Sequence, residues 1–147
     1  MKIRQAKQED KAEYIKMRKS SMASLSKISK EKIALSKKDI EKEFDKLIKK
    51  KDVFIFLMVE GKNVVGYINI LYIVNKKYLY LNDLFVKESF RSKGYGKMLM
   101  DKFIGFSKEK NVKTIGLSVR AQNKKAIKMY ERYGFKIIGL NMERKLK

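Results

Sequence analysis

The sequence predicts a single α/β domain built on a mixed β-sheet. Apolar runs of strand length, bounded by turn residues, fill the middle of the chain, and the longest of them is "VFIFLMV" at residues 53–59. Stripes of apolar residues at helical spacing flank these runs on both sides. No linker rich in proline, glycine or serine divides the 147 residues, so residues 1–147 are expected to form one domain.

A strand and two helices are expected first. Alternation of side chains predicts a strand over Lys2–Gln5, and helical spacing predicts a helix over residues 8–19, with two acidic residues at its start. The serine-rich residues 20–36 are expected to form a loop with a broken helical turn. Ser36, with an aspartate three residues later, resembles a capping box, and the apolar stripe after it predicts a helix over residues 37–50.

A β-meander and a third helix are expected next. Strands are predicted over residues 53–59, 64–74 and 78–86, separated by the turns "EGKN" and "NKK". A glycine-containing stretch follows the last of these strands. It precedes a helix that is predicted to run from residue 95 to about residue 110, because apolar residues recur there at four-residue spacing.

The last elements alternate between strand and helix. A strand is predicted over residues 114–119. Asn123 can cap a short fourth helix, and Gly134 can end that helix in the left-handed conformation. One or two final strands are expected between residues 135 and 146. The predicted element order is therefore β-α-α-β-β-β-α-β-α-β-β.

Composition excludes several kinds of chemistry. Because the chain has no cysteine and no histidine, it has no disulfide, no thiol nucleophile, no Ser-His-Asp triad and no imidazole ligand for a metal. We expect no metal, and acid–base work falls to carboxylates, tyrosine, lysine or water. The first residues have no signal-peptide core and no apolar run approaches roughly 18 residues, so a soluble, cytoplasmic protein that does not bind membranes is expected.

The strong positive charge has two explanations. Thirty-seven Lys and Arg outnumber sixteen Asp and Glu, which gives a net charge of +21. Such a charge favours polyanions, among them nucleic acid, an anionic membrane and a phosphate-bearing cofactor. The other explanation is compositional, because the lysines are spread along the whole chain and would solvate every face. The second explanation is the favoured one.

The stretch "FRSKGYGKML" at residues 90–99 has the composition of an anion site. A glycine-containing loop before a helix presents a row of backbone N–H groups at the positive end of the helix dipole, which favours phosphate. The glycines allow a ligand to approach the backbone, and Arg91, Lys93 and Lys97 add positive charge. A plain structural turn is the alternative. The glycine spacing is that of neither a Walker loop nor a Rossmann fingerprint.

Two motifs resemble those of the GCN5-related N-acetyltransferase (GNAT) superfamily. Residues 91–96, "RSKGYG", fit its Arg/Gln-x-x-Gly-x-Gly/Ala signature and directly follow "LNDLFVKESF" at residues 81–90. Residues 123–135, "NKKAIKMYERYGF", resemble its second motif, Asn-x-x-Ala-x-x-x-Tyr-x-x-x-Gly-Phe. The predicted element order is similar over essentially the whole chain. The resemblance implies the GNAT fold and an acetyl-CoA-dependent transferase that acts on an amine.

The resemblance also implies where acetyl-CoA would bind. Its pyrophosphate would lie against the loop from Arg91 to Gly96, and its pantetheine arm would pair with the strand over 78–86. That strand and the fifth strand would splay apart around the thioester. Asn123 would either touch the pantetheine arm or simply cap the fourth helix. The implied cofactor-binding residues are Leu84, Phe85, Val86, Arg91, Ser92, Lys93, Gly94, Tyr95, Gly96, Lys97, Asn123, Ala126 and Tyr130.

A base for the acceptor amine is harder to assign. An alkyl amine with a pKa of about 10.4 must lose a proton before it can attack. Relatives carry a carboxylate where this chain has Asn82, so Asp83 remains a candidate base and is otherwise a structural carboxylate. Deprotonation through water relayed by Asn82, Tyr80 and backbone carbonyls is the preferred route. Strict alternation would place Leu81, Asp83 and Phe85 on one face of the strand.

Tyr130 is the candidate general acid. It matches the tyrosine that protonates the leaving thiolate in the family that the motifs resemble. A phenol with a pKa of about 10 can donate to a thiolate whose conjugate acid lies near 8.5. The alternative is that Tyr130 is the core-facing end of the apolar stripe on its helix, beside Ala126 and Ile127.

The sequence alone does not determine the acceptor substrate or the binding partners. The leading hypothesis is transfer to a primary amine of a small molecule, a protein or a peptide. The alternative is an RNA-associated relative, either one that acetylates aminoacyl-tRNA or a non-catalytic basic module that binds CoA. Residues 17–36, which would line the acceptor side, carry no motif. A homodimer is left open, and nucleic acid is not the favoured partner.

Overall fold

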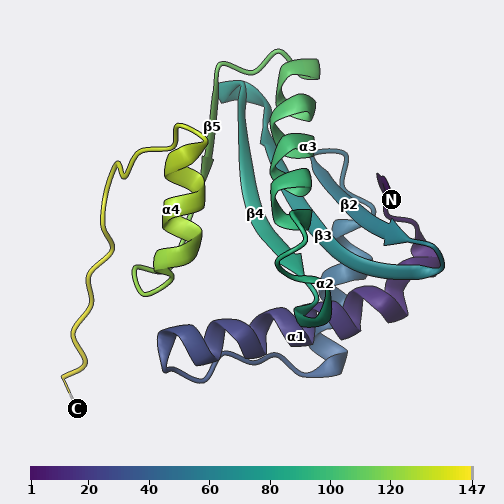
Figure 1. Cartoon of the computed structure of the whole chain (residues 1–147), viewed down its shortest axis with the longest axis horizontal. Coiled ribbons are helices and arrows are strands. Elements are labelled where there is room, and N and C mark those ends of the chain that lie inside the picture. Colours follow the sequence, from purple (N-terminus) through teal and green to yellow (C-terminus); the bar gives the residue numbers. More distant parts are fainter. Residues whose placement is uncertain (147) are drawn as a thin grey trace.

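The computed structural model describes residues 1–146, and a mixed sheet of strand order β1-β2-β3-β4-β5 forms its centre (Figure 1). Neighbouring strands from β1 to β4 are antiparallel, and β5 is parallel to β4. The strands are β1 (Lys2–Gln5), β2 (Val53–Glu60), β3 (Asn63–Ile73), β4 (Tyr78–Val86) and β5 (Thr114–Leu117). The helices are α1 (Lys11–Ser29), α2 (Lys37–Leu47), α3 (Tyr95–Glu109) and α4 (Lys124–Arg132), with short 3-10 turns at Gln8–Asp10, Val74–Lys76 and Glu88–Phe90.

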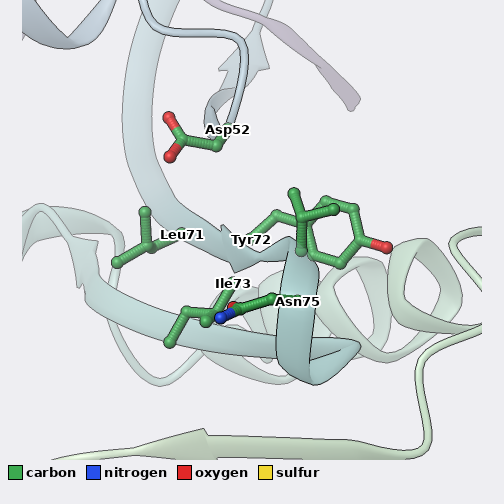
Figure 2. Close-up of a pocket in the computed structure, with 6 residues that line it drawn as sticks. Asp52, Leu71, Tyr72, Ile73 and Asn75 are labelled. Carbon is green, nitrogen blue, oxygen red and sulfur yellow. The ribbon is translucent and has the colours of Figure 1, made fainter.

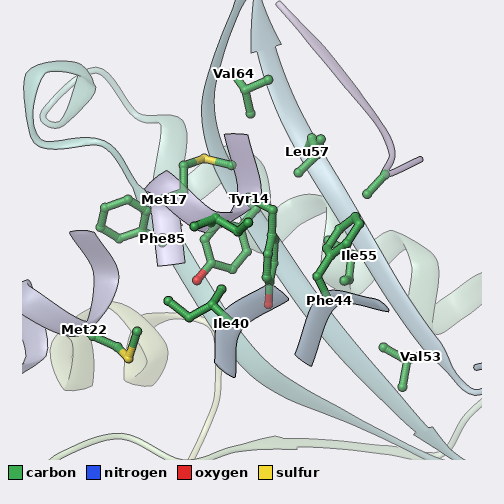
Figure 3. Close-up of a cluster of buried hydrophobic side chains, with 13 residues drawn as sticks. Tyr14, Met17, Met22, Ile40, Phe44, Val53, Ile55, Leu57, Val64 and Phe85 are labelled. Atoms are coloured by element: carbon green, nitrogen blue, oxygen red, sulfur yellow. The ribbon is translucent and has the colours of Figure 1, made fainter. Parts of the chain in front are cut away.

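Two apolar clusters hold helices on the two faces of the sheet. On one face, Tyr14 of α1 lies 5.0 Å from Phe44 of α2 and 5.5 Å from Tyr67 of β3 between ring centroids (Figure 3). On the other face, Leu99 and Phe103 of α3 are fully buried against β2, β3 and β4. The predicted mixed α/β fold is confirmed. Among residues 1–146, no helix is both long and apolar enough to cross a bilayer.

Three predicted helix boundaries are confirmed by their hydrogen bonds. The Ser36 hydroxyl accepts the backbone N–H of Asp39 at 3.1 Å at the start of α2. The Asn123 side chain accepts the backbone N–H of Ala126 at 3.3 Å at the start of α4. Gly134, just after α4, has a φ of 89°, the left-handed conformation that glycine adopts without strain.

Helix α1 extends to Ser29, so the loop predicted from residue 20 onward is wrong for its first half. Met22 is buried in the core, and this burial favours helix over a solvated loop. The serines lower the stability of the helix only slightly. The Ser26 hydroxyl, for example, donates to the carbonyl of Met22 at 3.0 Å, within the helix. The helix ends where Lys30 adopts a left-handed φ of 59°.

The one or two strands predicted between residues 135 and 146 are not formed. These residues extend away from the sheet beyond α4 (Figure 1), and β5 remains the last strand. The sequence pattern predicts strands here, but a strand also needs a neighbour with which to exchange hydrogen bonds. That neighbour is missing along residues 135–146.

Gly66 is expected to be required by close packing of two strands. A Cβ atom at this position would lie 2.6 Å from the carbonyl oxygen of Phe85 on β4, and backbone cannot move aside cheaply. Gly66→Ala should therefore lower the free energy of unfolding by about 2 kcal/mol. Gly105→Ala is the control, because Gly105 lies within α3 with nothing near its Cβ position, and alanine there should stabilise by up to about 1 kcal/mol. Urea denaturation of both variants tests this, and equal stabilities would contradict it.

Candidate active site

The candidate site is a gap that opens where β4 and β5 part. The two strands pair from Tyr78 to Leu81 of β4, opposite Thr114 to Leu117 of β5, and no pair follows. The second half of β4 therefore pairs with β3 on one edge and lacks a strand on the other. This splay matches the sequence prediction. It leaves the backbone from Leu84 to Val86, Phe85 included, without a neighbouring strand on its outer side, although the Val86 carbonyl there already accepts Arg91 Nε.

A β-bulge at Asn82 begins this gap. Leu81 pairs with Ile70 of β3 and Asp83 pairs with Asn69, so Asn82 is the extra residue. The prediction that Leu81 shares a face with Asp83 and Phe85 is wrong for this reason, whereas Asp83 and Phe85 do share one. Leu81 packs in the cluster under α3, whereas Phe85 packs in the cluster under α1 and α2, because the bulge reverses the alternation.

Asp83 is held in a partly buried polar cluster. Its side chain is 20% exposed, Oδ2 accepts a short hydrogen bond from the Tyr67 hydroxyl, and Nη1 of Arg18 lies 3.7 Å away. Burial raises the pKa of Asp83, although the Tyr67 hydroxyl and the Arg18 charge both act to lower it. A carboxylate with a raised pKa and a remaining exposed edge is suited to accept a proton.

The residues that support Asp83 were missed by the sequence reasoning. Arg18 of α1 also pairs with Glu43 of α2, from Nε to Oε2 at 3.2 Å, and the Tyr14 hydroxyl donates to the same oxygen at 3.1 Å. Asn69, opposite Asp83, is buried and its Oδ1 has no partner within residues 1–146. One signal was available: a carboxylate on a buried strand needs a cation, and Arg18 lies on the apolar side of its helix.

Tyr130 reaches the other side of the gap from α4. Its ring packs partly buried, edge to face with Phe135 at 6.1 Å between centroids. Burial raises the pKa of Tyr130, and the negative charge of Asp83 raises it further. Asp83 and Tyr130 are therefore close enough to interact electrostatically. The hydroxyl of Tyr133 holds α4 in place: its single proton is shared between two acceptors on α3, the Lys97 carbonyl at 3.1 Å and Asp101 Oδ1 at 2.9 Å.

The remaining catalytic candidates lie where the gap begins and just before it. Asn82 is exposed at the bulge. Tyr80, two residues earlier, donates its hydroxyl to Ser118 Oγ, just past the end of β5. Tyr80 therefore links β4 to the end of β5 before the point where the two strands part. Its hydroxyl proton is used in this hydrogen bond. Of the four candidates, Asp83 and Tyr130 are the two whose pKa values burial raises.

The loop before α3 presents free backbone donors. Ser92 has a φ of 64° and Gly94 a φ of 80°, so left-handed residues alternate with ordinary ones and turn successive N–H groups to one side. No side chain caps α3, and within residues 1–146 the N–H groups from Ser92 to Lys97 have no hydrogen-bond acceptor. Arg91 is different, because its N–H already donates to the Glu88 carbonyl at 3.2 Å. An anion would meet the donors that follow Arg91.

Side chains of the loop hold it against the protein. The Arg91 guanidinium donates from Nε to the Val86 carbonyl at 2.9 Å and from Nη2 to Ser24 of α1 at 3.2 Å. Tyr95 donates to Glu60 Oε1 of β2 at 3.1 Å, and the Lys93 ammonium lies 5.3 Å above the Phe90 ring. Arg91 and Tyr95 therefore position the loop with their side chains. Gly96 has open space at its Cβ position, and Lys97 follows in the first turn of α3.

The second motif is partly explained by structure alone. The side-chain oxygen of Asn123 caps α4 by accepting the backbone N–H of residue 126, so the cap accounts for Asn123. Ala126 is half-buried on α4. A contact of either residue with a ligand stays a prediction.

A comparison with known families decides the class of protein. The model of the family described as "Acetyltransferase (GNAT) family" matches residues 20–135. The chain belongs to this acetyltransferase family. The match spans both motifs and the gap between β4 and β5.

Solved structures share the fold of this acetyltransferase. The BH1408 protein from Bacillus halodurans, in a tetramutant form, is 21% identical, with a TM-score of 0.87 over 99% of this chain and 100% of that chain. A possible acetyltransferase from Clostridium difficile is 18% identical, with a TM-score of 0.79 over 98% and 95%. The aminoglycoside N-acetyltransferase AAC(6')-Iy, in complex with CoA, is 16% identical, with a TM-score of 0.79 over 99% and 95%.

Two pockets of the acetyltransferase differ in their relation to the gap. A pocket of about 480 Å³ lies at the end of β3, where Asp52, Leu71 and Tyr72 line it (Figure 2). It lies beside the beginning of β4, at the opposite end of that strand from the loop before α3. A pocket of about 190 Å³ lies between α1 and the end of β4, and Ser24 and Arg91 line it. The second pocket is the one that adjoins the candidate site.

Proposed function

We propose that this acetyltransferase transfers an acetyl group from acetyl-CoA directly to a primary amine. The observation that carries the proposal is that two features follow each other along the chain. The end of β4 has an edge that no strand pairs with, and the loop before α3 has a row of free N–H groups. The first suits an extended amide-bearing arm, and the second suits a pyrophosphate. The CoA complex of AAC(6')-Iy, which shares the fold, supports the choice of cofactor.

The residues present fit such a cofactor. Leu84, Phe85 and Val86 would offer backbone to the pantetheine arm, and the donors from Ser92 to Lys97 would hold the phosphates. Bound acetyl-CoA would supply an activated acetyl thioester. The open space at the Cβ positions of Gly94 and Gly96 is compatible with a ligand lying against this loop.

Two residues of the chain would accept and donate the protons that move during the transfer. Asp83 accepts the proton that the acceptor ammonium must lose before its nitrogen attacks the thioester carbon. As the carbon–sulfur bond breaks, the Tyr130 hydroxyl gives its proton to the departing sulfur, and solvent restores that proton. Raised pKa values suit both roles, because Asp83 then accepts more readily and Tyr130 remains protonated at neutral pH.

The acceptor would enter from the side of α1 and α2. Arg120, beyond β5, approaches Glu31 of the α1–α2 connection at 3.8 Å, so these segments meet across the mouth of the gap. Arg18 and Glu43 line the floor beneath Asp83. The proposal covers amines of small molecules and of peptides, in the cytoplasm. Release of free thiol from acetyl-CoA, measured over a panel of small amines, peptides and aminoacyl-tRNA, tests it. No acceptor-dependent release from any member would contradict the proposal.

Acetyl-CoA is expected to raise the melting temperature of the parent protein, because a ligand that binds only the native state stabilises that state. Gly94→Val should abolish the rise, since a branched side chain would obstruct the donors. Gly61→Val is a matched control: Gly61 also has a positive φ and open space, but it lies in the β2–β3 turn. Both variants should lose similar intrinsic stability, and only Gly61→Val should keep the response. A parent protein that does not respond to saturating acetyl-CoA would contradict the cofactor assignment.

A further inference from the structure

The smaller pocket of the acetyltransferase has a positively charged lining. Helix α1 passes the end of β4 in Figure 1, and this pocket of about 190 Å³ lies between the two. Its lining includes Ser24 and Lys27 of α1, and Phe85, Lys87, Glu88 and Arg91 from the end of β4 onward. Three of the lining residues are cations and one is a carboxylate. None of them belongs to the donor row from Ser92 to Lys97, so the pocket uses other residues than the proposed phosphate site.

The Arg91 guanidinium is fixed in the wall of this pocket. Its Nε donates to the Val86 carbonyl at 2.9 Å, its Nη2 donates to Ser24 Oγ at 3.2 Å, and its central carbon lies 5.5 Å from the centroid of the Phe85 ring. Two of the five N–H groups of the guanidinium are used in this way, and the others have no acceptor within residues 1–146. A fixed guanidinium with free N–H groups suits a carboxylate or a phosphate, because its planar fork matches both.

Two further donors line the same pocket. Ser24 Oγ accepts the bond from Arg91 with a lone pair, so its own proton stays free to be donated. Lys27 forms no ion pair in the part of the chain that the structure describes. Lys87 contributes less, because its ammonium already lies 3.4 Å from Glu13 Oε2. Arg91, Ser24 and Lys27 are therefore all able to donate to one anion.

The pocket lies beside the proposed base. Asp83 and Phe85 share a face of β4, and two residues of a strand span about 7 Å. Helix α1 follows the same course, since Arg18 approaches Asp83 at 3.7 Å and Ser24 contacts Arg91. A ligand of that length therefore reaches from Asp83 into the pocket.

We infer that this pocket binds an anionic group of the acceptor, a carboxylate or a phosphate, about 7 Å from the amine that is acetylated. The inference rests on the proposed transfer from acetyl-CoA to an amine whose ammonium lies at Asp83. It names the class of acceptor, an amine that carries an anion about five bonds away. An amine without the anion lacks these contacts, and a diamine would place a second cation beside Arg91 and Lys27, which disfavours it.

Thiol release from acetyl-CoA, measured with four primary amines of similar length, tests the inference. The amines are 5-aminopentanoate with a carboxylate, 3-aminopropyl phosphate with a phosphate, pentylamine with neither, and 1,5-diaminopentane with a second ammonium. The kcat/KM of the parent protein should be at least about 10-fold higher for the better anionic amine than for pentylamine, and lowest for the diamine. The better anionic amine identifies the anion. Equal values for all four amines would overturn the inference.

Lys27→Glu should remove most of this preference, and Lys19→Glu is the matched control. Both lysines are exposed on α1 and both substitutions change the net charge equally, but Lys19 does not line the pocket. The preference should fall by about 10-fold in Lys27→Glu and by less than about twofold in Lys19→Glu, while the KM for acetyl-CoA changes little in either. An equal loss in both variants would assign the preference to the overall positive charge of the chain. A matching rise in the KM for acetyl-CoA would assign the pocket to the cofactor. Either result overturns the inference.

Binding without catalysis separates this inference from the proposed function. In a titration of the parent protein with 3-aminopropyl phosphate, followed by nuclear magnetic resonance without acetyl-CoA, the amides of residues 24–27 and 85–91 should shift. The dissociation constant should rise about 10-fold in Lys27→Glu and not in Lys19→Glu. No binding, or shifts confined to the donor row from Ser92 to Lys97, would overturn the inference even where acetyl transfer is observed. Binding in the pocket without turnover of any amine would support the anion site and contradict the proposed function alone.

Discussion

Asp83→Asn is expected to lower kcat by about 10²- to 10³-fold, in the range that a positioned general base supplies. Asparagine keeps the size of the side chain and can still accept the Tyr67 hydroxyl, but it cannot take a proton. In the parent, the rate should fall on the acid side as Asp83 becomes protonated. Because burial raises the pKa of Asp83, this fall should lie above the pH at which an ordinary aspartate titrates, and the variant should lack it.

The same substitution should leave the fold intact at neutral pH. A carboxyl group whose pKa is raised in the folded protein stabilises the fold only while it is protonated, and this stabilisation is lost as pH rises through the folded pKa. At neutral pH the ionised carboxylate is therefore a cost, and Asp83→Asn should have an equal or higher melting temperature. Asn82→Ala and Tyr80→Phe are the comparison variants, because they change the two side chains of the alternative route through water. If they lose activity while Asp83→Asn does not, water relayed by Asn82 and Tyr80 is the route.

Tyr130→Phe is expected to lower kcat by about 10²-fold while the Michaelis constant for acetyl-CoA changes little. The substitution removes the proton donor and keeps the ring that packs against Phe135, so the loss should fall on the transition state. The alkaline fall in rate should lie above pH 10, because burial and Asp83 both raise the pKa of Tyr130, and it should disappear in the variant.

Tyr133→Phe is the matched control for Tyr130. Both tyrosines lie at the end of α4, but the Tyr133 hydroxyl binds Lys97 and Asp101 on α3. Its loss should lower stability by about 1 kcal/mol and leave kcat within a few-fold of the parent. If Tyr130→Phe behaves like this control, Tyr130 serves only packing, and the sulfur takes its proton from water.

Local signals in the sequence were sufficient for most of the fold. The capping residues Ser36 and Asn123 and the glycine at 134 act within a few residues of themselves, so their effects can be read from short stretches. The length of α1 could not be read in this way. Its second half is helical because Met22 is buried by partners distant in the sequence, and intrinsic preference is weak beside such burial.

The parts of the candidate site that lie in the two motifs were named from the sequence. The parts that depend on the pairing of β3 with β4 were missed. The loop from Arg91 to Gly96, with Lys97, and Tyr130 on the fourth helix were predicted from two short motifs, and their roles in binding and catalysis stay predictions. The bulge at Asn82 depends on the register between β3 and β4, which no local pattern indicates. Without the bulge, the support of Asp83 by Arg18 could not be foreseen, because the two residues would lie on opposite sides of the sheet.

The bulge at Asn82 makes the register of β4 as important as its composition. A substitution in this strand changes one side chain, whereas regular pairing of Asn82 with β3, without the bulge, would turn every later side chain to the opposite face. Asp83 would then point under α3, away from Arg18. Divergence of activity among chains of this fold is therefore to be sought in the presence or absence of this bulge, and not only in the residues that an alignment compares.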